Sequence, residues 1–268
     1  IEEVLLIKDF NIVFEDMIDD LIGDSKLLPE LKNHADGKQV DHIYKYKSLL
    51  AEDEIYFVGD SKYYKPQNSI GKYSKAKQFT YAKNVIQYNI DLFNDNKLDK
   101  KLRYREILTE GYNITPNFFI SAFVKKDFDF SKSYLDETGK PIMQTHFENR
   151  LFDRDTLFVQ SYNINFLFVL SSYLSNNSTL KTNFKKDTHK KFREKLVSFI
   201  NDKYQFYKIK PSDDNFLDKY FKLLNGKMYR PSQLENELIL AFQKDSDIDG
   251  VISQIEAELE EKTNYTLK

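Results

Sequence analysis

Hydrophobic residues near the start of the chain recur every three or four positions. This spacing predicts an amphipathic helix over residues 10–22, and the Gly23-Asp24-Ser25 segment that follows supplies a stop. The apolar positions that share this helical face are Phe10, Val13, Phe14, Met17, Ile18, Leu21 and Ile22.

Runs typical of strands come next. Residues 39–47 are rich in β-prone side chains, and the short apolar run 55–58 indicates a buried strand. Residues 118–124 and 156–160 are further strand candidates. Residues 72–89 and 164–174 have helical patterns, and this succession of strands and helices predicts an α/β core.

The pattern changes at about residue 176. An Asn- and Ser-rich loop is followed by helical patterns, and no long strand is evident. We therefore expect a core over residues 1–175 and a mainly helical C-terminal elaboration over 176–268. The helical patterns cover residues 185–205, 212–224, 231–243 and 247–262.

Composition narrows the class of protein. Forty Lys and Arg residues against 42 Asp and Glu residues give a net charge of −2, so a nucleic-acid surface would have to be a local patch. The absence of cysteine excludes a thiol nucleophile, thiolate zinc sites and Fe–S clusters. No apolar run reaches the roughly 20 residues that a membrane helix needs, and we expect no membrane partner. The start at Ile1-Glu2-Glu3 carries no basic signal region. The lack of a signal region and of a membrane helix leads us to expect a cytoplasmic protein. The chain also lacks an initial Met, so we expect a fragment of a longer protein.

A carboxylate and an amine follow the buried strand. Residues i and i+2 of a strand point to the same face, so Asp60 and Lys62 are expected to project together. Such a pair suits phosphodiester hydrolysis, because the carboxylate can hold a divalent metal and the amine can orient a water. About six acid-x-base triplets are expected by chance in this composition, and a plain surface ion pair is the alternative.

A second metal ligand is expected on the preceding strand. Asp41 lies 19 residues upstream of Asp60, and a hairpin would bring the two carboxylates together. Glu15, on the polar side of the first helix, could complete the site or fix a water. No Gly-x-Ser-x-Gly elbow is present, although a Ser–His–Asp arrangement remains open, and the four histidines have no ligand spacing.

Asp41 followed by Asp60-x-Lys62 resembles the core motif of the PD-(D/E)xK nuclease superfamily, with Val40 where the name expects Pro. Gln78 and Tyr81 are similar to the Gln-x-x-Tyr element of some branches. The segments 117–120, 149–156 and 162–167 resemble LlaJI-type restriction endonucleases, relatives of the McrC subunit. The resemblance covers about residues 10–173.

The resemblance implies a restriction-endonuclease-like mixed sheet flanked by helices. It also implies Mg²⁺-dependent DNA cleavage in a restriction system, with Mn²⁺ as a possible substitute. An AAA+ NTPase of McrB type is the partner that the resemblance implies. This chain has no phosphate-binding Gly-x-x-x-x-Gly-Lys loop of its own. Two cuts in a duplex need two active sites, so a homodimer is a further expectation. The alternatives are an inactive DNA-binding or assembly subunit of the same fold and a nuclease for RNA or branched DNA.

A basic and aromatic stretch follows the acidic pair, and it suggests contact with the phosphate backbone near the scissile bond. A solvated helix face is the alternative. Gln78 and Tyr81 share a helical face and could line the site. The residues expected to contact DNA are Lys65, Lys72, Lys75, Lys77, Gln78 and Tyr81.

Three further charged segments have structural alternatives. Residues 150–155 alternate in charge, and we expect Asp153 and Asp155 to organise a loop rather than bind a ligand. Residues 185–193 are basic and could be a DNA-binding helix or a solvated face. The acidic stretch 245–261 is expected to serve packing or a protein partner, because it would repel DNA.

Overall fold

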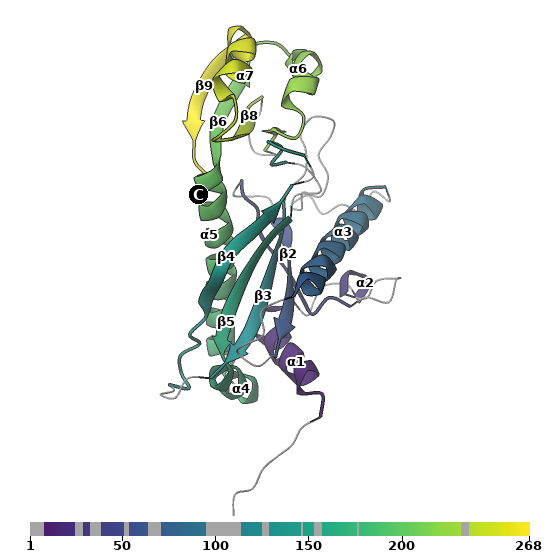
Figure 1. Ribbon diagram of the computed structural model, residues 1–268, viewed down its shortest axis with the longest axis vertical. Coiled ribbons are helices and arrows are strands. Elements are labelled where there is room, and N and C mark those ends of the chain that lie inside the picture. Colours follow the sequence, from purple (N-terminus) through teal and green to yellow (C-terminus); the bar gives the residue numbers. More distant parts are fainter. Residues whose placement is uncertain are drawn as a thin grey trace, which may run out of the picture.

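The fold consists of two sheets and a long helix, α5 (Ser178–Lys203), which runs along the first sheet and leads into the second sheet at its C-terminal end (Figure 1). The computed structural model describes residues 8–24, 29–32, 39–50, 54–63, 71–94, 114–124, 129–145, 147–152, 157–175, 177–231 and 236–268. The first sheet has five strands in the order β1-β2-β3-β5-β4, and the second has four in the order β7-β8-β6-β9. The predicted mixed α/β class is therefore confirmed.

The first half of the chain contributes these elements: α1 (Phe10–Ile22), α2 (Pro29–Lys32), β1 (His42–Lys47), β2 (Glu54–Lys62), α3 (Lys72–Asn94), β3 (Thr115–Phe123), β4 (Asp136–Gln144), β5 (Leu157–Asn165) and α4 (Phe166–Leu174). The second half contributes these: α5 (Ser178–Lys203), β6 (Tyr204–Pro211), α6 (Phe216–Leu224), β7 (Met228–Tyr229), β8 (Leu238–Gln243), α7 (Ile248–Ile255), the short 3₁₀ helix η1 (Glu256–Glu258) and β9 (Leu259–Tyr265).

The first sheet has a parallel centre and antiparallel edges. Strands β2, β3 and β5 run parallel, while β1 and β4 pair antiparallel at the two edges. The central strands are buried over most of their length, as expected for a sheet covered on both faces. Strand β4 is exposed, polar and interrupted by Gly139 and Pro141, so the sequence did not predict it.

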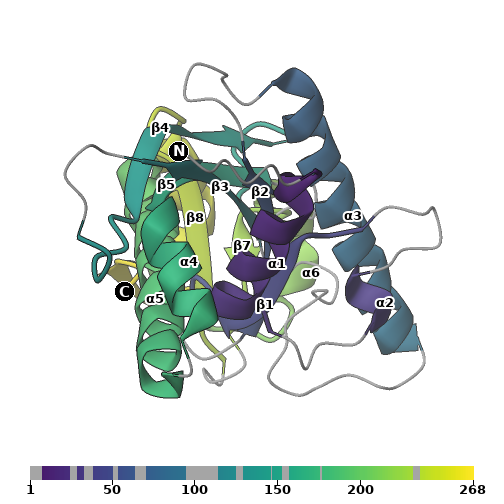
Figure 2. The same ribbon diagram turned by 90° about the horizontal axis from the view of Figure 1, so that it is seen from below.

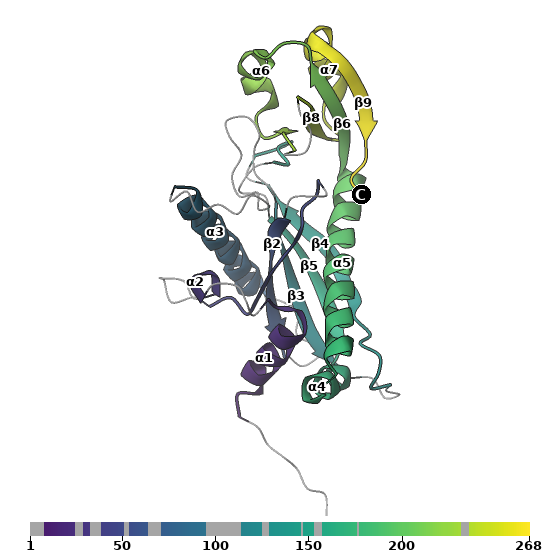
Figure 3. The ribbon, with the colours of Figure 1, turned by 180° about the vertical axis from the view of Figure 1, so that it is seen from behind.

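Helices cover the two faces of this sheet unequally. Helix α3 lies on one face, where Tyr81 and Val85 pack against Tyr56 and Val58 of β2. Helices α1, α4 and α5 lie on the other side of the strands (Figures 2 and 3). Strands β2, β3 and β5 point toward the end of the sheet where α1 and α4 lie (Figure 1). The C-terminal end of β2 is therefore near α1.

Gly59 lets an aromatic ring approach β2 closely. A methyl group at this position would lie 2.1 Å from atoms of the Phe118 ring. Phe118 lies opposite Gly59 on β3 and packs against Phe192 of α5, with ring centroids 4.8 Å apart. Gly59 therefore allows the packing between β2, β3 and α5.

The basic cluster of residues 185–193 faces the interior rather than DNA over part of its length. His189 donates to the Ile22 carbonyl at 2.7 Å, and Arg193 donates to the Ser48 carbonyl at 2.9 Å. Lys185 and Lys191 also donate to backbone carbonyls. These contacts tie α5 to the end of α1 and to the loop between β1 and β2.

The expectation of a mainly helical segment after residue 176 is wrong in part. Helix α5 is present, and α6 and α7 occupy parts of the predicted helices. However, residues 238–243 and 259–265 form strands of an antiparallel sheet, and β6 begins directly after α5. Strand β8 is a six-residue apolar run, a length at which periodicity does not separate strand from helix. The predicted division at residue 175 stays a prediction. One hydrophobic cluster contains side chains from both sides of that residue.

Candidate active site on the α3 face of the sheet

The β1–β2 hairpin brings the two predicted acids to one place. The strands pair from Lys47 with Glu54 to His42 with Gly59, and one further step puts Asp41 opposite Asp60. Side chains alternate along a strand, so Asp60 shares its face with Val58, which packs toward α3. The hairpin predicted from the sequence is confirmed, and it places both carboxylates at the C-terminal end of β2.

Asp60 is a buried carboxylate with two lysines beside it. Only 1% of its surface is exposed. Its carboxylate forms an ion pair with Lys62, and the Nζ atom of Lys77 lies 3.8 Å from the Oδ1 atom of Asp60. The predicted pairing of Asp60 with Lys62 is thus present, and Lys77 adds a second cation from α3.

Asp41 is held by the backbone of β2. Its Oδ2 atom accepts a hydrogen bond from the Ser61 N–H at 3.1 Å. Burial and then the negative charge of Asp60 raise the pKa of Asp41 to about 6. Glu15 raises it further, while His42 and the Ser61 N–H act in the opposite direction. A shift of this kind marks negative charges that are brought together in a partly desolvated place.

Glu15 of α1 belongs to the same electrostatic cluster. Burial raises the pKa of its carboxyl group, and the charge of Asp60 raises it further. Lys62 and Lys77 act in the opposite direction. Glu15 of α1, Asp41 just before β1 and Asp60 of β2 therefore lie in one cluster beside two lysines, in agreement with the place expected for Glu15.

Gln78 and Tyr81 lie beneath the surface. Both are fully buried between α3 and the sheet, so direct contact with a phosphate backbone, which the sequence suggested, is not open to them. The ring centroid of Tyr81 lies 5.2 Å from the ammonium of Lys77. Burial works to lower the pKa of Lys77, but the Tyr81 hydroxyl and the carboxylates of Asp60 and Asp41 raise it overall. Tyr81 is therefore placed to hold Lys77 near Asp60.

Gln78 has buried amide atoms with no hydrogen-bond partner among the described residues. Asn117 of β3 lies on the same face of the sheet, and its Oδ1 atom is also buried without a hydrogen-bond partner among these residues. Unsatisfied buried polar groups are costly, and native structures keep few of them. The amide groups of Gln78 and Asn117 thus add buried polar atoms to the interface between α3 and the sheet.

A Ser–His–Asp arrangement is present on the opposite face of β2. The Nε2 atom of His42 lies 2.5 Å from the Oγ atom of Ser61, and its Nδ1 atom lies 3.5 Å from Asp19 of α1. Asp19 also pairs with Lys32. His42 points away from the face of Asp41, as the alternation of a regular strand requires.

This arrangement does not offer a nucleophile to a substrate. His42 is fully buried on the side of α1, and Ser61 lies within a strand rather than at a sharp turn. The arrangement instead helps to position Asp41. His42 contacts the hydroxyl of Ser61, and the backbone N–H of Ser61 donates a hydrogen bond to the Asp41 carboxylate. The sequence did not single out Asp19 or Ser61, since the pairing depends on the strand register and on the packing of α1.

The carboxylates of Asp41 and Asp60 suit a magnesium ion whose coordination is completed by waters and by substrate phosphates. In the described part of the chain, no three Asp, Glu, His or Cys side chains form a ready-made metal group. Mg²⁺ in nucleotide and phosphate enzymes is commonly held by one or two carboxylates, with waters and substrate phosphates filling the other positions. Asp41 and Asp60 provide two hard oxygen ligands, and their crowded negative charge is what a cation would relieve.

The remaining predicted DNA contacts divide into three groups. Lys77, with 46% of its side chain exposed, lies beside the acid cluster, which consists of Glu15, Asp41 and Asp60. Lys72 and Lys75 line a groove between α3 and strands β4 and β5. Lys65, Asp153 and Asp155 lie outside the described residues. Arg150 is described, and its guanidinium group lies 4.8 Å from the ring centroid of Phe147.

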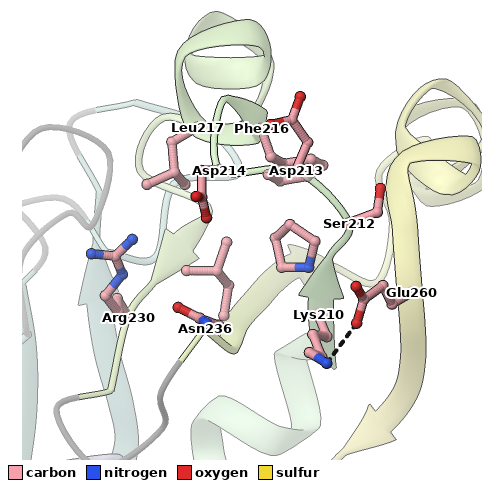
Figure 4. A pocket seen from close by; sticks show the side chains of 11 residues that line it. Lys210, Ser212, Asp213, Asp214, Phe216, Leu217, Arg230, Asn236 and Glu260 are labelled. Atoms are coloured by element: carbon pink, nitrogen blue, oxygen red, sulfur yellow. Dashed lines mark ion pairs between the residues drawn. The ribbon is translucent and has the colours of Figure 1, made fainter.

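A second cavity lies beside the C-terminal sheet. It measures about 220 Å³ and lies among β6, β8 and the start of α6 (Figure 4). Lys210 and Glu260 form an ion pair of 2.5 Å at its side, and Asp214 and Arg230 also line it. Its charges are of both signs, so they favour no single class of ligand.

Comparison with models of protein families, with curated proteins and with solved structures finds no match for this chain. The resemblance to the PD-(D/E)xK superfamily therefore stays a prediction. Among the described helices, none has the length and apolar character that would carry it across a membrane.

Proposed function

We propose that this chain is a Mg²⁺-dependent nuclease that hydrolyses phosphodiester bonds in DNA, with a restriction-endonuclease-like core. The observation that carries the proposal is that Asp41 accepts the Ser61 N–H and is influenced by the charge of Asp60, while the amine of Lys62 is paired to Asp60. This set corresponds to the motif that the sequence suggested. By the same resemblance, the chain would be the nuclease subunit of a restriction system that works with an AAA+ NTPase.

Each group in the cluster has a role in such a reaction. Asp41 and Asp60 would hold the ion, which supplies positive charge to the phosphate and lowers the pKa of a bound water. The ammonium groups of Lys62 and Lys77 can donate hydrogen bonds to phosphate oxygens as negative charge develops on them. Glu15, whose pKa is raised, can position the attacking water and accept its proton.

The test compares cleavage and binding in matched variants. Asp60→Ala should lower the rate of plasmid cleavage in Mg²⁺ by at least about 10²-fold, because it removes a ligand and the partner of Lys62. DNA binding measured with Ca²⁺ in place of Mg²⁺ should be unchanged or slightly tighter, since a negative charge near the phosphate is lost. Asp187→Ala, an exposed position on α5, is the matched control and should cleave as the wild type does.

Two outcomes would contradict the proposal. Cleavage by Asp60→Ala at the wild-type rate would remove Asp60 from the site. Wild-type protein that binds DNA but stays inactive in Mg²⁺, with and without its NTPase partner, would favour the alternative of a DNA-binding or assembly subunit. A panel of supercoiled, branched and single-stranded DNA with RNA would then decide the substrate class.

A further inference from the structure

An apolar groove lies on the same face of the sheet as the acid cluster. It measures about 490 Å³ and runs between the first turns of α3 and strands β4 and β5. Pockets of about 300–1,000 Å³ are typical of sites for small molecules and for parts of larger ligands. Its apolar walls are formed by Ala76, Phe79, Ile142, Leu157 and Val159.

The strand register sets the distance between this groove and Asp60. Val159 pairs with Asn117, and Asn117 pairs with Val58, which lies two residues before Asp60. Two strand spacings across the sheet and two residues along it give about 12 Å between the Cα atoms of Val159 and Asp60. A nucleic-acid strand covers that distance in a few nucleotides, so one strand can reach both places.

Lysines of α3 connect the groove with the acid cluster. Lys72 and Lys75 line the groove, and Lys77 reaches toward Asp60 two residues further along the helix. In the part of the chain that the structure describes, neither Lys72 nor Lys75 forms an ion pair with an acidic side chain. Positive charge along an apolar floor is complementary to a single strand, which offers phosphates outside and the flat faces of bases inside.

We propose that this groove binds a base of an unpaired DNA strand, with Lys72 and Lys75 contacting the phosphates beside it. The base makes apolar contact with Phe79 and Ile142 in place of its stacking neighbour. A base in a duplex is stacked and paired, so the strand must be open at this point. The inference rests on the proposed function, because it assigns the acid cluster to the same strand.

The test uses binding without cleavage. Fluorescence anisotropy in Ca²⁺ compares a labelled oligothymidylate with an oligonucleotide of equal length and charge that carries only abasic sugars. Contact between a base and an apolar or aromatic wall is worth about 1–3 kcal/mol, so the wild type should bind the intact oligonucleotide about 5- to 150-fold more tightly. Both lysines act on the phosphates, so Lys75→Ala should weaken the binding of both oligonucleotides alike.

Two variants remove the groove in different ways. Phe79→Ala takes away a wall, and Ala76→Tyr fills the groove from an exposed position where folding should not suffer. Both should abolish the preference for the intact oligonucleotide. Tyr73→Ala is the control, because Tyr73 is an aromatic residue of α3 that is 93% exposed and does not line the groove.

Equal binding of the two oligonucleotides by the wild type would overturn the inference, and so would a full preference in Ala76→Tyr. The outcome is separate from that of the proposed function. A base preference that depends on the groove in a protein that never cleaves would uphold the groove and refute the nuclease. Cleavage without any base preference would do the reverse.

Discussion

Asp41→Asn should make the protein more stable near neutral pH while it removes the proposed metal site. The pKa of Asp41 is about 6 in the folded chain, raised from 3.8 by burial and by the charges of Asp60 and Glu15. One pKa unit corresponds to about 1.4 kcal/mol, so the ionised carboxylate costs the native state at most about 3 kcal/mol. Asp41 is only half-buried and solvent screens part of this charge, so we expect a gain of about 1–3 kcal/mol.

The sign of the effect depends on pH. Below the unfolded pKa of 3.8, Asp41 is protonated in both states and the cost is absent. The cost develops as the pH rises from 3.8 to about 6 and is then constant, because the unfolded state releases its proton first. Asparagine keeps the shape and can still accept the Ser61 N–H, so the variant should exceed the wild type in stability near pH 8 and match it near pH 3.5.

The assay is urea denaturation at several pH values, in EDTA and in Mg²⁺. A cation that binds only the folded state at about 100 times its dissociation constant adds about 2.7 kcal/mol, and this gain should appear in the wild type but not in Asp41→Asn. Asp187→Asn serves as the matched control on an exposed helix face. A variant that is no more stable than the wild type near pH 8 would show that Asp41 carries no unfavourable charge.

Three further predictions concern the groups around β2 and α5. His42→Ala should weaken the stabilisation by Mg²⁺ at least several-fold in ion concentration, because Ser61 loses its partner and holds Asp41 less firmly; an unchanged Mg²⁺ titration would contradict this. Gly59→Ala should cost about 1–3 kcal/mol in urea denaturation through its clash with Phe118, whereas Gly71→Ala, which meets no neighbour, should change little. Burial lowers the pKa of His189 from 6.5 to about 4. The free energy of unfolding should therefore be highest above pH 6.5 and fall by at most about 3 kcal/mol as the pH drops from 6.5 to 4, because the unfolded chain takes up the proton first. His189→Gln should show a smaller loss over that window, and an identical loss would place the titration elsewhere.

The sequence predicts best where one periodicity dominates. The apolar spacing of residues 10–22 matches α1 to the residue, and Phe14, Met17, Ile18, Leu21 and Ile22 are buried as predicted. Val13, however, is 37% exposed, because the helix packs through a narrower stripe than its apolar positions suggest. Hairpin geometry likewise allowed Asp41 and Asp60 to be paired in advance, since the side-chain period of a strand is fixed.

The missed strands β4 and β9 depend on pairing with another strand rather than on an apolar pattern of their own. Strand β4 carries little apolar pattern and exists because its backbone pairs with β5. Strand β9 is largely exposed and polar, and it pairs with β6, about fifty residues earlier in the chain. The contact between Asp19 and His42 similarly requires α1 to pack on β1, which no local pattern encodes.

The two faces of β2 show why the candidate site is on the α3 side. On the face toward α1, the buried polar groups of Ser61, His42 and Asp19 contact one another, and that face is closed to solvent. On the face toward α3, burial and the charge of Asp60 raise the pKa of Asp41. Folding alone would favour apolar residues at those two positions, as it does at Val58 and Tyr56 along the same face. The ionised carboxylate of Asp41 is unfavourable for folding, yet Ser61 and His42 on the other face hold it in position. Such an arrangement is expected when the carboxylate binds a ligand.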